Sequence, residues 1–139
     1  MDIKQFVAGR ALIIHNGKVL IIRESAKYED GNNIGKYDIP GGKINSDESY
    51  EEGLKREVLE ETKLKIKVGK PFFVTEWYPV IKGNKVQIIG TFCECYCETN
   101  EVTLSQDHDD YKWIDPAQYN NFPLTDKLES AFKSYLTNL

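Results

Sequence analysis

Three glutamates, Glu57, Glu60 and Glu61, lie within five consecutive residues of the segment REVLEET. If this segment is helical, residues three and four apart share one face, so Glu57 lies along the axis from both other acids. Like charges at this spacing destabilise an isolated helix by roughly a few tenths of a kcal/mol per pair. The closeness of these three negative charges therefore requires either that solvent surrounds the side chains or that a cation lies between them.

The residues before these acids predict a helix that begins after Ser49. Ser49 and Glu52 fit a capping box, in which each side chain accepts a hydrogen bond from a free backbone N–H group at the helix start. The residues up to Thr62 are mostly good helix formers, and Leu54 and Val58 form an apolar i, i+4 edge. The acids thus fall in the later turns, away from the helix end whose dipole would stabilise them.

Apolar, β-branched runs on both sides of this helix predict strands. Strands near residues 7–14 and 19–23 are joined by Asn16-Gly17, a strong hairpin signal. Two longer runs, residues 66–81 and 84–98, flank Lys82-Gly83-Asn84, which predicts a second hairpin. The polar, glycine-rich segment 25–36 is expected to be a loop. A further short strand is expected at residues 111–114.

The C-terminal segment from Thr125 predicts an amphipathic helix, because Leu128, Phe132 and Leu136 recur at intervals of four residues. Strands around one helix, with another helix at the end, indicate class α/β (α+β), a mixed sheet sandwiched between helices. With 139 residues, one domain spanning 1–139 is the economical organisation.

The charge balance narrows the classes of partner. A net charge of −4 argues against a protein that binds the phosphate backbone of a nucleic acid polymer, because such proteins need a basic face. The N-terminus has no apolar stretch of signal-peptide length, and no run of eighteen apolar residues occurs. We therefore expect a cytoplasmic protein that does not bind membranes and whose partner is a small molecule.

The three cysteines alternate in TFCECYC, so Cys93, Cys95 and Cys97 face the same side if this run is a strand. An odd number at this spacing is a poor disulfide framework. Side chains two residues apart on a strand are about 7 Å apart, whereas a zinc ion needs each sulfur at about 2.3 Å. The pattern therefore favours reduced cysteines in the core.

Residues 41–64, GGKINSDESYEEGLKREVLEETKL, resemble the signature box of the Nudix hydrolases. That box is a glycine, five residues, a glutamate, seven residues, Arg-Glu, an aliphatic residue, any residue, Glu-Glu, any residue, a glycine and an aliphatic residue. Its fixed positions are occupied here by Gly42, Glu48, Arg56, Glu57, Val58, Glu60, Glu61 and Leu64. Only the late glycine is replaced, by Lys63. In the family this glycine follows the helix, so a lysine there either adopts a left-handed conformation, at about 1–2 kcal/mol, or changes the helix exit.

The resemblance implies that Glu57, Glu60 and Glu61 bind Mg²⁺ or Mn²⁺, with the backbone carbonyl of Gly41 as a further ligand. The chemistry agrees, because hard divalent cations select carboxylate oxygens. Arg56 would orient the acids through charge-assisted hydrogen bonds, and Glu48 would shape the loop before the helix. The alternative is a solvated helix surface on which Arg56 simply pairs with Glu60.

Other site residues follow from the resemblance. Members of the family commonly supply a further acidic residue from a loop that precedes a late strand containing a tryptophan. In SQDHDDYKW this residue is Asp107, which would be a metal ligand or the general base. The alternative is that the segment is only an acidic turn. Arg23 resembles a phosphate-facing arginine of relatives, or is an ordinary strand-end charge. Trp77 and Tyr78 are expected to stack on a nucleobase, unless they belong to the core.

The resemblance implies a metal-dependent pyrophosphohydrolase that cleaves a nucleoside diphosphate linked to a moiety X. Pro79, fifteen residues after Leu64, has a spacing associated with members that cleave ADP-ribose. Oxidised nucleoside triphosphates, ADP-ribose, dinucleoside polyphosphates and nucleotide sugars are all open as substrates. The alternative is a non-catalytic nucleotide sensor on the same fold. Either protein is expected to be a monomer or a homodimer.

Overall fold

The computed structural model describes residues 3–27 and 33–139, so the middle of the expected loop 25–36 lies outside the described residues. The elements that the hydrophobic pattern predicts occur in the predicted order, and two further short strands and a 3₁₀ helix lie between them. The elements are β1 (Lys4–His15), β2 (Lys18–Glu24), β3 (Tyr37–Asp38), β4 (Gly41–Lys43), α1 (Tyr50–Thr62), β5 (Lys67–Trp77), β6 (Val80–Ile81), β7 (Asn84–Tyr96), β8 (His108–Ile114), the 3₁₀ helix η1 (Pro116–Asn121) and α2 (Asp126–Thr137).

The sheet has the strand order β3-β2-β1-β7-β5, with β4 paired to β1, β6 to β7 and β8 to β2. Strands β1 and β7 run parallel over most of their length, whereas the other pairs are antiparallel. The sheet is therefore mixed, as predicted. Along one edge, β1 pairs with β2 only at Ile14 and His15, and with β4 from Ala8 to Arg10. This exchange of partners places the Gly41-Gly42 pair directly beside the middle of β1.

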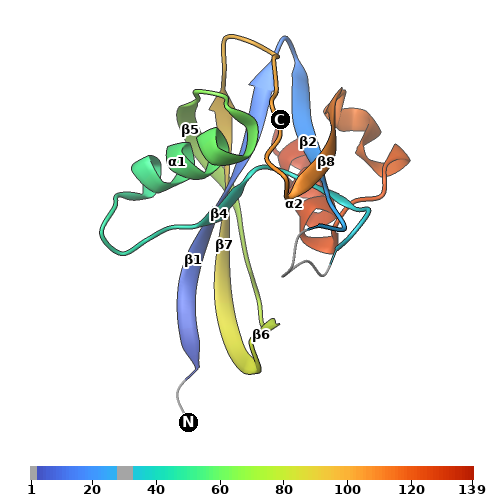
Figure 1. Ribbon diagram of the computed structural model, residues 1–139. Helices are drawn as coiled ribbons and strands as arrows, with labels where there is room; N and C mark the ends of the chain where they lie inside the picture. Colours follow the sequence, from blue (N-terminus) through green and yellow to red (C-terminus); the bar gives the residue numbers. More distant parts are fainter. Residues whose placement is uncertain (1–2, 28–32) are drawn as a thin grey trace.

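Side chains alternate across the central strands and build one apolar core on each face of the sheet. Leu12 and Phe92 pack in the core that contains Leu128 and Phe132 of α2. Their neighbours Ala11, Ile13, Cys93 and Cys95 pack in the core that contains Leu54 and Val58 of α1. Figure 1 shows the two helices on opposite sides of the central strands, which confirms the predicted sandwich of a sheet between helices.

Both ends of α1 follow from local chemistry. Ser49 and Glu52 form the predicted capping box. At the other end Lys63 has φ 64°, a left-handed conformation, and its N–H group donates to the carbonyl of Leu59. The lysine therefore takes the conformation for which the motif normally uses glycine, and the helix exit is preserved.

The two predicted hairpins form at the expected residues. The turns Asn16-Gly17 and Lys82-Gly83 have positive φ at both residues, as two-residue hairpin loops that match strand twist require. The strand expected at residues 111–114 begins earlier, at His108, because His108 and Asp110 pair with Glu24 and Arg23 of β2, with an irregularity in the register at Asp109.

The cysteines lie where the alternation predicted. Cys93 and Cys95 are buried, Cys97 is half-buried, and all three are free thiols in the core beneath α1. Burial raises the pKa of Cys95 to about 12, so this thiol stays protonated and unreactive at neutral pH. In the described ranges, no helix has the length and apolar character needed to cross a membrane. The cytoplasmic location stays a prediction.

Candidate active site

The Gly41-Gly42 pair at the start of β4 lets the acids of α1 approach the backbone of the sheet. Gly41 has φ 149°, and a Cβ atom on it would lie 1.9 Å from the carbonyl oxygen of Gly9. A Cβ atom on Gly42 would lie 2.6 Å from Oε2 of Glu57. The Gly41 N–H group donates to Oε1 of Glu61 at 2.8 Å. The two glycines are therefore required because a carboxylate and a neighbouring strand occupy the space of a side chain.

Arg56 holds the first part of the acidic motif together. Its Nε and Nη2 atoms donate to both carboxylate oxygens of Glu48, at 3.0 and 2.7 Å. Its Nη1 atom donates to Glu57 at 3.1 Å and to Glu60 at 3.3 Å, and Nη2 also donates to the carbonyl of Lys43. The arginine thus joins the loop before α1 to the helix and fixes the carboxylate of Glu57, as the sequence predicted.

The acids of the motif have opposite electrostatic environments. The Arg56 hydrogen bonds lower the pKa of Glu48 to about 2. Loss of hydration raises the pKa of Glu61 to about 8, against the hydrogen bond from Gly41 and the charge of Arg10. Burial also raises the pKa of Glu57, although Arg56 opposes this shift. Glu57 and Glu61 therefore carry negative charge at a cost that a nearby cation would remove.

A cleft of about 470 Å³ opens beside these two acids. It brings together seven residues that the sequence singled out: Gly41, Gly42, Glu57, Glu61, Trp77, Pro79 and Asp107. Its other walls come from β1, β2, the segment 33–38, β4, β6, the first half of β7 and the start of β8. The remaining charged and polar residues of the lining are Arg10, Glu24, Asn33, Lys36, Asp38, Lys43, His108 and Thr125.

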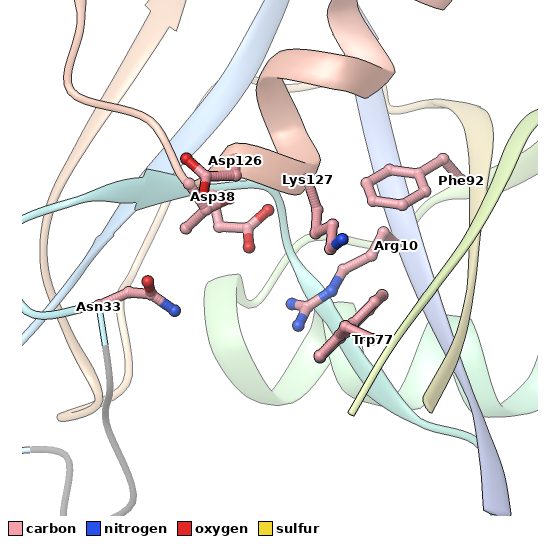
Figure 2. A pocket seen from close by; sticks show the side chains of 8 residues that line it. Arg10, Asn33, Asp38, Trp77, Phe92, Asp126 and Lys127 are labelled. Atoms are coloured by element: carbon pink, nitrogen blue, oxygen red, sulfur yellow. The ribbon is translucent and has the colours of Figure 1, made fainter. Parts of the chain in front are cut away.

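A smaller cavity of about 230 Å³ adjoins the cleft and shares part of its lining, including Arg10 and Trp77. Figure 2 shows Arg10, Trp77 and Asp38 around this cavity, with Lys127 pointing into it from the first turn of α2. The ring of Trp77 is placed by Gly90 of β7, where a Cβ atom would lie 2.4 Å from Cζ3 of the ring. The two cavities form one recess that runs from the acids of α1 to the start of α2.

The other predicted site residues lie outside the cleft. Glu48 and Arg56 are in the network beside it, and the side chain of Glu60 is 59% exposed and paired with Arg56. Arg23 forms an ion pair with Asp109 at 2.7 Å. Tyr78 is exposed and makes hydrogen bonds to the side chains of Glu76 and Gln87. The roles expected for Glu60, Arg23 and Tyr78 stay predictions.

Sequence reasoning missed six charged or titratable residues of the cleft: Arg10, Glu24, Lys36, Asp38, Lys43 and His108. Arg10 had a usable signal, since it is the one charge inside the apolar run FVAGRALII. His108 is half-buried, and burial lowers its pKa, so the ring is neutral at pH 7. Its Nδ1 atom has no hydrogen-bond partner among the described residues. The sequence gives no signal that separates this histidine from a surface residue.

The donor set of the cleft fits a hard divalent cation. Within residues 3–27 and 33–139, no three carboxylate, imidazole or thiol groups are already gathered around one point. Mg²⁺, however, is commonly held by one or two carboxylates together with substrate phosphates. Glu57 and Glu61 supply two poorly hydrated carboxylates in one cleft, and both have raised pKa values. A cation recruited together with a phosphorylated substrate therefore fits these residues.

Comparisons with known proteins agree with the motif and the fold. Residues 5–136 match the model of the NUDIX domain. The nucleoside triphosphatase NudI of Klebsiella pneumoniae is 25% identical over 81% of this chain and 84% of the relative, and that of Escherichia coli O139:H28 is 27% identical over 65% and 69%. A MutT protein from Methanosarcina mazei has 27% identity and a TM-score of 0.85, covering 99% of this chain and 97% of that one.

The Nudix family generally uses divalent metal ions and acts on small nucleotide substrates. The family match covers nearly the whole chain, and the signature box forms the helix and glycine turn that its spacing requires. The chain therefore belongs to the Nudix family and is a hydrolase of phosphoric anhydride bonds.

Proposed function

We propose that this protein is a metal-dependent pyrophosphohydrolase that cleaves a nucleoside diphosphate linked to a moiety X. Water attacks one phosphorus, the P–O–P bond breaks, and the products are a nucleoside monophosphate and phosphorylated X. The observation that supports this most is that Glu57 and Glu61 line the same cleft as Trp77. Acids suited to a divalent cation and an aromatic ring suited to a nucleobase thus border one recess.

Glu57 and Glu61 would hold Mg²⁺ or Mn²⁺. The carbonyl of Gly41, Asp107 and Glu60 are the further candidate ligands, and Glu60 would first have to leave Arg56. When bound, such a cation neutralises the diphosphate and lowers the pKa of a coordinated water molecule. The family's general use of divalent metals supports this assignment.

The chain's own residues prepare the reaction. Arg56 fixes the Glu57 carboxylate, and Glu48 holds Arg56 from the other side, so the acid keeps its position when no ligand is present. Asp107 lies in the cleft wall and can accept the proton of the attacking water. Trp77 borders both cavities and can stack on the base.

The name of the NudI relatives, nucleoside triphosphatase, supports a nucleotide as the substrate. In a nucleoside triphosphate the moiety X is a phosphate group, so the proposal includes this class. We also propose that one domain spanning residues 1–139 carries the whole activity.

Formation of the nucleoside monophosphate tests the proposal. Purified protein with Mg²⁺ or Mn²⁺ is assayed against nucleoside triphosphates including oxidised ones, ADP-ribose, dinucleoside polyphosphates and nucleotide sugars, with and without EDTA. We expect hydrolysis of at least one class, lost with EDTA and in Glu61→Gln, and retained in Lys55→Gln, which removes an exposed charge from α1. A wild-type protein that binds a nucleotide but returns it intact would instead be the sensor.

A further inference from the structure

Arg10 is a positively charged residue that, like the acidic Asp38, lines both cavities. It lies in the middle of β1, where it is paired with Gly41 on one side and Phe92 on the other. Backbone pairing on both sides makes this one of the most rigid positions of the sheet. Its side chain lines both the cleft of the α1 acids and the smaller cavity beside α2. Any ligand that spans the recess must pass this guanidinium.

The guanidinium of Arg10 has unused hydrogen-bonding capacity. Among the described residues it forms no ion pair, and its hydrogen bond to the carbonyl of Ile39 is long, at 3.4 Å. Arg56, by contrast, uses every nitrogen. A half-buried guanidinium has five N–H donors in a planar fork, the geometry that suits a phosphate group.

A second cation points into the same cavity. Lys127 extends from the first turn of α2, and Figure 2 shows its ammonium group on the same side of the recess as the guanidinium of Arg10. Lys127 likewise forms no ion pair with a described carboxylate. Asp38 and Asp126 also line this cavity, but neither forms an ion pair with Arg10 or Lys127, so an anion bound between the two cations would be attracted by both.

We infer that Arg10, assisted by Lys127, binds the phosphate that stays attached to the nucleoside, while the smaller cavity takes the nucleoside itself. This inference rests on the proposed function, and it adds the direction in which the substrate lies. The nucleoside is held at the start of α2, its phosphate at Arg10, and the scissile anhydride bond extends toward Glu57 and Glu61. Arg10 would thereby determine which P–O–P bond reaches the acids.

Product binding without metal tests this contact directly. In EDTA, calorimetry measures the dissociation constants of AMP, GMP, CMP and UMP and of the corresponding nucleosides. The monophosphate and nucleoside pair that binds most tightly is then used for the variants. The ratio of the two dissociation constants measures what the phosphate contributes. We expect the wild-type monophosphate to bind about ten- to hundredfold tighter than the nucleoside, the range of a charge-assisted hydrogen-bonded contact.

Three variants and one control identify the residue responsible. In Arg10→Gln the ratio should fall close to one, in Arg10→Lys and Lys127→Gln it should fall partly, and in Lys55→Gln it should not change. Affinity for the nucleoside should stay within about twofold in all of them, since a residue that only shapes the cavity would weaken both ligands equally. Thermal melting checks the fold, and if Arg10→Gln is unfolded, Arg10→Lys and Lys127→Gln decide.

An unchanged ratio in folded Arg10→Gln, or in both Arg10→Lys and Lys127→Gln, would overturn the inference. So would a wild-type protein that binds monophosphate no tighter than nucleoside. An Arg10 variant could need more Mg²⁺ for hydrolysis and still keep the wild-type ratio of nucleoside to monophosphate dissociation constants. That result would show that Arg10 acts only through its charge on Glu57 and Glu61, and it would also overturn the inferred contact with the phosphate. Hydrolysis of the substrate panel by wild-type protein is a separate result, so failure of the proposed function is distinguished from failure at Arg10.

Discussion

Two acids of the signature box are the same residue type in opposite environments: Glu48, just before α1, and Glu61, in its last turn. Glu48 accepts two hydrogen bonds from Arg56 and a third from a loop N–H group, and its pKa falls to about 2. Glu61 accepts one backbone hydrogen bond and loses its hydration, and its pKa rises to about 8. The first acid contributes to the fold, whereas the second is destabilising when ionised. The difference shows which acids of the motif are kept available for a ligand.

The largest expected effect separates Glu61 from Glu60. Glu61→Gln should lower turnover by more than about a thousandfold, because it removes a carboxylate that faces the cleft. Glu60→Gln should lower it by about ten- to hundredfold, because Glu60 is exposed and acts through Arg56 in this structure. Steady-state kinetics with Mg²⁺ measures both. Equal losses would show that Glu60 leaves Arg56 to join the cleft, and would remove the distinction between the acids.

A substitution that displaces Glu57 should have the next largest effect. A Cβ atom on Gly42 would overlap the Glu57 carboxylate, so Gly42→Ala should lower turnover by about a hundredfold through misplacement of that acid. Gly83→Ala is the control, since its φ of 79° makes alanine strained but nothing lies near its Cβ position. It should cost about 1 kcal/mol of stability and leave turnover unchanged. Full activity in Gly42→Ala would show that the position of Glu57 is not critical.

The pH dependence of stability tests the two environments directly. Because the pKa of Glu61 is raised to about 8 in the folded protein, the unfolded chain releases this proton first as the pH rises. The free energy of unfolding without metal should therefore decrease between about pH 4.5 and 8, and stay low above that. Urea denaturation in EDTA measures it.

Two variants should change this profile in opposite ways. Glu61→Gln should lose most of the decrease, keeping the part due to Glu57, whose pKa is also raised, and should be more stable than wild type at pH 8. Glu48→Gln should be less stable than wild type at neutral pH, and this difference should shrink as the pH falls toward 2, where the folded protein protonates Glu48. A wild-type curve that is flat from pH 4.5 to 8 would contradict the environment assigned to Glu61.

The smallest expected effect is at the end of the helix. Lys63 is left-handed with φ 64°, so Lys63→Gly should raise the free energy of unfolding by about 1 kcal/mol, the relief of strain minus the greater freedom of glycine in the unfolded chain. Turnover should not change, since Lys63 is outside the cleft. Denaturant titration and kinetics on one preparation measure both. A change in turnover would show that the helix exit contributes to the position of Glu61.

The parts of the fold that sequence predicted are those with local causes. The capping box at Ser49, the Asn16-Gly17 and Lys82-Gly83 turns and the alternation of Cys93 and Cys95 each depend on neighbours in sequence. Strands β3 and β4, of two and three residues, carry no periodic pattern and form only because β2 and β1 offer pairing partners.

The residues of the candidate site likewise fall into those predicted from local sequence and those brought together only by the fold. The acids and glycines of the signature box have a fixed spacing, so the sequence indicates their shared position. Arg10 and His108 are distant from the box in sequence, and the pairing of β1 with β4 and of β2 with β8 brings them to the cleft. The family resemblance points to Arg23 as a phosphate-facing arginine and does not point to Arg10. Only the side-chain alternation of β1 and the pairing of Arg23 with Asp109 distinguish the two arginines.

If Trp77 stacks on the nucleobase as proposed, its contact with Gly90 links ligand choice to a position remote from the chemistry. Since the tryptophan ring rests against the bare backbone of β7, any larger residue at position 90 would push the ring away from its present place. The width of the recess would change while the acids, the glycine turn and the arginine network stayed as they are. Evolution or engineering could thus retune which nucleotides the enzyme accepts through a single buried strand position, without rebuilding the machinery that breaks the bond.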